Sequence, residues 1–79
     1  MFKRLSGYIN NKEFKINIYN NLINIDNYDE IVTLTDNLIV IRYDKNYVYI
    51  KGNNLSIRRL LDNELLIDGN IGAINFNDK

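Results

Sequence analysis

The sequence contains no cysteine, histidine, proline or tryptophan among its 79 residues. Without cysteine, the chain has no disulfide bond and no thiolate ligand for a metal. Without histidine as well, a zinc site or a histidine-based catalytic relay is excluded. We therefore expect a protein that is not an enzyme and that binds no metal or cofactor.

Excess charge and long apolar runs are also missing. Ten basic residues balance ten acidic ones, and a neutral chain has no general attraction for nucleic acid or anionic lipid. No window approaches the roughly 18 apolar residues of a membrane span, and no apolar run follows the basic residues near the N-terminus. We expect a soluble cytoplasmic protein without a signal peptide, a membrane span or a nucleic-acid partner.

Alternation of apolar and polar residues is the main pattern that is present. The alternating or β-branched runs lie at 14–18, 23–25, 31–35, 37–43, 47–51, 54–57, 65–67 and 71–76. Asparagine, aspartate and glycine, which favour turns, separate these runs. The pattern predicts an all-β fold of seven or eight short strands. We assign residues 13–77 to a single domain and residues 1–12 to a short N-terminal lead.

A weak repeat accompanies the alternation, because Ile31, Val48 and Leu65 lie 17 residues apart. Tandem hairpins in a small β-sandwich or roll would produce this period from two strands and two turns. A short β-solenoid with one coil per repeat is the alternative. A solenoid needs capped ends, and neither end of this sequence looks like a cap.

Residues 57–65 interrupt the alternation with the sequence IRRLLDNEL. Their apolar positions fit one face of a helix, and they also fit a strand that bends or bulges at Leu60–Leu61. The arginine pair has two interpretations as well. Arg58 and Arg59 could form a solvated ion-pair cluster with Asp62 and Glu64, or, with Leu60, a contact patch for a protein partner.

Two acidic clusters and two glycines are further candidates for a role. Asp26, Asp29 and Glu30 form one cluster, and Asp62, Glu64 and Asp68 form the other. Each cluster lies in a predicted turn, where acidic residues are common, so we assign them no catalytic or calcium-binding role. Gly52 and Gly69 each end an apolar run and precede asparagine. We predict that they are structural turn residues with positive φ or close backbone packing.

Aromatic residues leave one alternative function open. Six tyrosines and three phenylalanines could stack bases in a small β-barrel that binds single-stranded nucleic acid. Such a platform needs a basic groove beside it, and the basic residues here are dispersed. Core or cross-strand packing is therefore the favoured role of the aromatic residues.

Residues 48–76, VYIKGNNLSIRRLLDNELLIDGNIGAINF, resemble the YabP/YqfC family of sporulation proteins, on the side of its YqfC branch. The matching positions are Ile50, Gly52, Leu55, Ile57, Arg58, Leu61, Glu64, Ile67, Gly69, Ile71, Ile74 and Phe76. Members often carry proline at the position of Asp62, which favours strand, turn and strand over a helix. The resemblance implies a non-enzymatic protein of the mother cell, at or near the forespore surface, acting in spore envelope (coat or cortex) morphogenesis with a membrane-protein partner.

The size of the chain favours a homo-oligomer. A domain this small has a small core, and no disulfide or metal supports it. Its β-branched strands also lack proline, which commonly blocks an exposed sheet edge. The predicted contact is a sheet edge near Leu55 to Leu61, with Arg58 and Arg59 pairing to acidic residues of a neighbour, such as Asp26 or Asp29.

Overall fold

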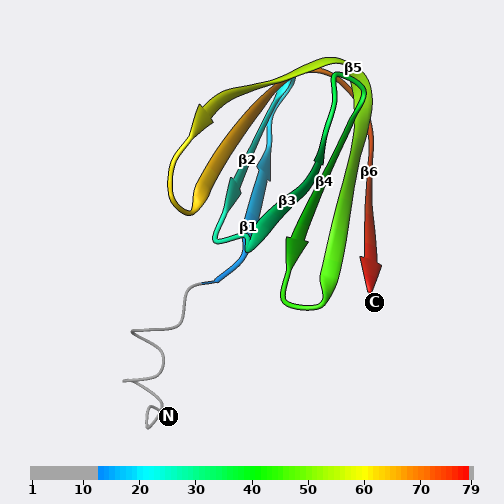
Figure 1. Ribbon diagram of the computed structural model, residues 1–79. Coiled ribbons are helices and arrows are strands. Elements are labelled where there is room, and N and C mark those ends of the chain that lie inside the picture. Colours follow the sequence, from blue (N-terminus) through cyan, green and yellow to red (C-terminus); the bar gives the residue numbers. More distant parts are fainter. Residues whose placement is uncertain (1–12, 79) are drawn as a thin grey trace, which may run out of the picture.

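The computed structural model describes residues 13–78, so the N-terminal lead, residues 1–12, lies outside the described residues. The described residues form six strands and no helix (Figure 1). The strands are β1 (Lys15–Ile18), β2 (Leu22–Asp26), β3 (Glu30–Leu34), β4 (Leu38–Tyr43), β5 (Asn46–Leu60) and β6 (Glu64–Asp78). They pair in one antiparallel sheet of order β1-β2-β6-β5-β4-β3. The prediction of an all-β fold is confirmed.

Two long strands take the place of four predicted short ones. The runs at 47–51 and 54–57 both belong to β5, and those at 65–67 and 71–76 both belong to β6. The two strands curve together over one end of the molecule (Figure 1). Their pairing register shifts between Lys51 and Gly52 and again between Asn53 and Ser56, which marks the bend. The β-solenoid alternative is wrong, because coils of a solenoid stack with parallel strands and these strands pair antiparallel.

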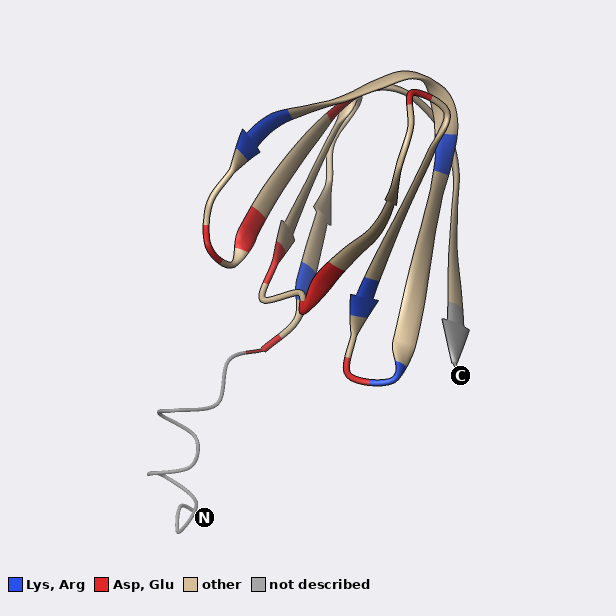
Figure 2. Cartoon of the chain, in the orientation of Figure 1, with Lys and Arg blue, Asp and Glu red and all other residues tan. Residues whose placement is uncertain are grey.

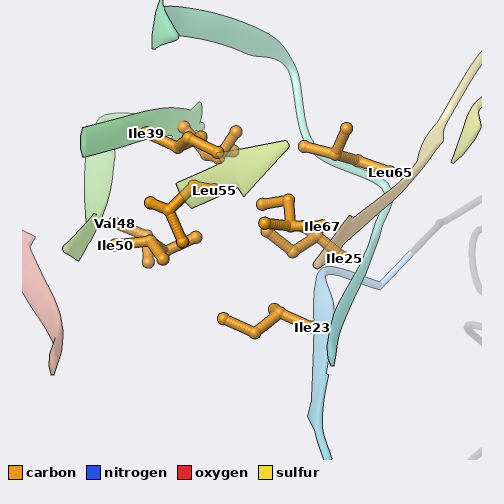
Figure 3. Packing of buried hydrophobic residues seen from close by; sticks show 9 residues of the cluster. Ile23, Ile25, Ile39, Val48, Ile50, Leu55, Leu65 and Ile67 are labelled. Carbon is orange, nitrogen blue, oxygen red and sulfur yellow. The ribbon is translucent and has the colours of Figure 1, made fainter. Parts of the chain in front are cut away.

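The bend divides the sheet into two halves that share one core. The β1 half consists of β1, β2 and residues 56–60 and 64–68 of the long strands, and the β3 half consists of β3, β4 and residues 46–51 and 71–78. Alternate residues of a strand share a face. The buried cluster accordingly takes Ile23, Ile25, Leu65 and Ile67 from the β1 half, Ile39, Ile41, Val48 and Ile50 from the β3 half, and Leu55 from the bend (Figure 3).

Gly52 and Gly69 lie inside β5 and β6 at the bend, and not in turns between strands as predicted. A side chain on Gly52 would overlap the carbonyl oxygen of Asn70. Gly69 has a φ of +140°, and a Cβ atom there would lie 2.5 Å from the carbonyl oxygen of Asn54. Glycine is needed at both positions because the two backbones approach closely where both strands bend.

Hydrogen bonds from the bend reach the turns of both short hairpins. The N–H of Gly52 donates to Asn37 O (3.2 Å), and the N–H of Leu55 donates to Asp36 O (2.8 Å), in the β3–β4 turn. The N–H of Gly69 donates to Asn21 O in the β1–β2 turn (3.2 Å). These bonds satisfy backbone groups that the register shifts would otherwise leave unpaired.

Residues 57–65 form strand, turn and strand, as the family resemblance implied, and contain no helix. β5 ends at Leu60, the chain reverses over residues 61–63, and the N–H of Leu61 donates to the carbonyl oxygen of Glu64 (2.8 Å). The predicted bulge exists but lies earlier than Leu60–Leu61, because the register shifts between Ile57 and Arg59.

Candidate functional site

The three predicted contact residues lie on the outer edge of β5, near the end of the β5–β6 hairpin. In the described part of the chain, residues 56–60 pair with β6 on one side and have no strand on the other. Arg58 donates to Asp68 Oδ2 (2.9 Å) across the hairpin, so its ion pair differs from the predicted cluster with Asp62 and Glu64. Arg59 has no ion pair within residues 13–78. Leu60 is 54% exposed.

An open groove with a volume of about 970 Å³ lies beside this hairpin end. We call it the acidic groove. Its lining residues are Lys15, Asp26, Asn27, Tyr28, Asp29, Glu30, Ile31, Leu60, Leu61, Asp62, Asn63 and Glu64. Both acidic clusters of the sequence contribute to it, and only Asp68 is left out.

Long-range strand pairing brings the two acidic clusters together. Asp26 of β2 lies directly opposite Glu64 of β6 in the sheet register. The N–H of Asn27 also donates to the carbonyl oxygen of Asn63 (2.6 Å), joining the β2–β3 connection to the β5–β6 turn. The sequence interpretation missed this groove because each cluster, taken alone, has the composition of an ordinary turn.

Negative charge dominates the acidic groove, in which five carboxylates face one lysine. Arg42 offsets part of this charge, with Nε 3.1 Å from Glu30 Oε1 and a terminal nitrogen 3.7 Å from Asp29 Oδ2. Asp62 has no ion pair within residues 13–78. Burial raises the pKa of the Tyr28 phenol above its ordinary value, and the negative charge of Asp62 raises it further. The groove therefore suits a cationic group with an apolar stem.

The wall of the groove formed by residues 27–29 is held at several points. The Asn27 side-chain amide donates to the carbonyl oxygen of Glu13 (2.7 Å). The N–H of Asp29 donates to Arg42 O (2.8 Å), and its carboxylate accepts from the N–H of Asp44 (2.6 Å). Asn27 has a φ of 65°, a conformation that asparagine tolerates better than most residues. These hydrogen bonds hold residues 27–29 in one conformation, so this wall of the groove is preorganised for binding.

Metal-binding geometry is absent from the described part of the chain, in which no group of three or more acidic side chains could hold a metal ion. The same residues contain no helix long and apolar enough to cross a membrane.

Four apolar residues face the core side of the sheet and are nevertheless exposed. Residues directly opposite each other on paired strands share a face. Each of the four lies opposite a fully buried partner: Ile18 opposite Ile23, Leu34 opposite Ile39, Leu60 opposite Leu65, and Phe76 opposite Val48. Their exposed fractions are 58%, 52%, 54% and 61% in that order. We call them the edge residues, because each lies on an outermost strand of its half.

Comparison with known proteins identifies the family. The model of the YabP family matches residues 10–79. The chain belongs to the YabP family. No curated protein and no solved structure matches it. Membership of the YabP family confirms the family recognised from the sequence and indicates a role related to sporulation. The match does not distinguish the YqfC branch.

Proposed function

We propose that this YabP-family chain is a non-catalytic assembly protein of the spore envelope. It acts in the mother cell, at the forespore surface, during coat or cortex morphogenesis. It does so by binding further copies of itself and a membrane-protein partner. The observation that carries the proposal is the set of four edge residues, which expose large apolar side chains at the edges of the sheet formed by residues 13–78.

Association stabilises such a chain because it covers apolar surface that the small core leaves open. Fully burying a large apolar side chain contributes about 1.5–3 kcal/mol. Chains of this size, with no disulfide or metal in support, commonly gain stability by oligomerising. Proline, which would block an exposed edge, is absent from the sequence.

The acidic groove supports the membrane-protein partner. Cytoplasmic loops of membrane proteins carry an excess of lysine and arginine. A loop of that kind complements the carboxylates of Asp26, Asp62 and Glu64, and its aliphatic stems can contact Leu60 and Leu61. The preorganised wall at residues 27–29 reduces the cost of ordering this surface on binding.

Self-association of the wild-type protein is the first expected result. Sedimentation velocity between about 1 and 100 µM should show a dimer or a larger species, because even modest edge contacts give affinities in this range. Serine at each edge residue in turn should identify the contacts in use. All four sites are exposed, so circular dichroism should show that these variants stay folded. A folded protein that remains monomeric up to about millimolar concentration would contradict the proposal.

Nucleic-acid binding is expected to be absent, in contrast to the alternative of a single-strand-binding β-barrel. Non-specific binding needs several lysine or arginine contacts to phosphates, and the groove beside the β5–β6 hairpin end is acidic. Fluorescence anisotropy with labelled single-stranded DNA and RNA at about 150 mM salt should detect no complex. Sub-micromolar affinity that weakens steeply with added salt would support the β-barrel instead.

A further inference from the structure

The end of the β5–β6 hairpin carries three kinds of side chain in a fixed order. The order is basic at Arg58 and Arg59, apolar at Leu60 and Leu61, and acidic at Asp62 and Glu64. We call residues 58–64 the hairpin tip. Residues 58–63 are all exposed, and Leu61 is 51% exposed. Figure 2 shows the basic end of β5 followed, after a short tan stretch, by the acidic turn and the acidic start of β6.

This order makes the hairpin tip complementary to itself. A two-fold axis between Leu60 and Leu61 places the basic end of one copy opposite the acidic end of the other, and the same contact occurs twice. The leucines of both copies meet at the centre, where they cover apolar surface. Closed two-fold dimers are also the commonest assemblies of identical chains.

We propose that the hairpin tip binds the hairpin tip of a second copy of this chain in a two-fold dimer. The inference rests on the proposed function and specifies one of its self-contacts. A basic segment of another protein would pair with the acidic end and could contact the leucines, but it would leave Arg59 without an opposite charge. A second copy covers all three parts of the tip.

The two arginines have different roles in this contact. Arg58 is held by Asp68 of its own chain at 2.9 Å, whereas neither Arg59 nor Asp62 has an ion pair within residues 13–78. With the axis between the leucines, Arg59 faces Asp62 of the second copy. The bulge between Ile57 and Arg59 leaves only a short regular edge, so the contact is small and depends on its charge pairs.

Charge exchange between two variants tests this contact. Arg59→Glu reverses the basic charge that faces the second copy, and Asp62→Lys reverses the opposing acidic charge. Each variant alone places like charges opposite each other, so we expect its dissociation constant to rise at least about tenfold. An equimolar mixture restores both attractive pairs and should form a mixed dimer. Sedimentation and native mass spectrometry measure both effects.

Matched controls separate this contact from a general effect of charge. Lys45→Glu and Asp36→Lys make the same reversals at exposed turn positions outside the hairpin tip, and both should associate like the wild type. Leu61→Ser removes part of the apolar centre without changing charge, and it should also weaken association. Circular dichroism should show every variant folded, because all of these side chains are exposed.

The outcomes distinguish the inference from the proposed function. Restored association in the mixture supports the two-fold contact. If the wild type associates while both reversals leave association unchanged, or if the mixture fails to restore it, the hairpin-tip contact is wrong and self-assembly through other edges stands. If the wild type is monomeric up to about millimolar concentration, both proposals fail.

Discussion

Replacing Gly52 with valine is expected to lower the free energy of unfolding by about 1–3 kcal/mol, the scale of overpacking. The new Cβ atom would overlap the carbonyl oxygen of Asn70 in the neighbouring strand. That oxygen belongs to the backbone, so β5 and β6 must move apart at the bend. Gly69→Val should have a similar effect, because Gly69 has positive φ and also lies against the backbone of Asn54.

Gly72→Val is the matched control for both changes. It places the same side chain in β6 close to the bend, where a Cβ atom would meet nothing closer than 3.5 Å. We expect its unfolding midpoint in urea to stay near that of the wild type, while the Gly52 and Gly69 variants unfold at much lower denaturant concentration. If all three variants unfold alike, close packing at the bend does not limit stability.

Leu55→Ala is the second change with a large expected effect, about 2–5 kcal/mol of unfolding free energy. Leu55 is 4% exposed and is the member of the buried cluster that lies at the bend. Figure 3 shows it among the other side chains of the cluster. It contacts the shared core at the point where β5 passes from one half of the sheet to the other. Truncating its side chain leaves a cavity that neighbours from two half-sheets cannot fill by a local movement.

Leu34→Ala provides the control, because it removes the same atoms from a residue that is 52% exposed. Its effect should remain within about 0.5 kcal/mol. Small domains are stable by roughly 0.05–0.15 kcal/mol per residue, so the loss at Leu55 is a large fraction of the total. Thermal and urea unfolding of both variants, at concentrations where association is absent, measure the difference. Equal effects at the two positions would mean that the core is not centred on the bend.

The candidate site could be predicted only in part. The sequence drew attention to Arg58, Arg59 and Leu60 because they interrupt an otherwise regular alternation, and the structure places all three on an exposed edge. The sequence did not show that the two arginines differ in their ion pairs. Arg58 has an ion pair because it reaches Asp68, which is ten residues away in the sequence. The two residues come close only because β5 and β6 pair across the hairpin.

Alternation by itself determined the β-strands and the residues that face the core. This holds because side-chain direction in a strand depends only on position along it, with a period of two. Ile23 and Ile25, on either side of Asn24, could be placed on one face in this way. The family resemblance added the strand, turn and strand over residues 57–65, and the composition predicted that disulfides and zinc take no part.

Tertiary structure decided how those strands meet. Short runs merged into β5 and β6 because Gly52 and Gly69 let the paired strands bend without ending. The acidic groove exists because β2 pairs with β6, which sets Asp26 opposite Glu64. Contacts between residues so far apart in the chain depend on which strand edges find each other, and no local pattern in a single sequence records that choice.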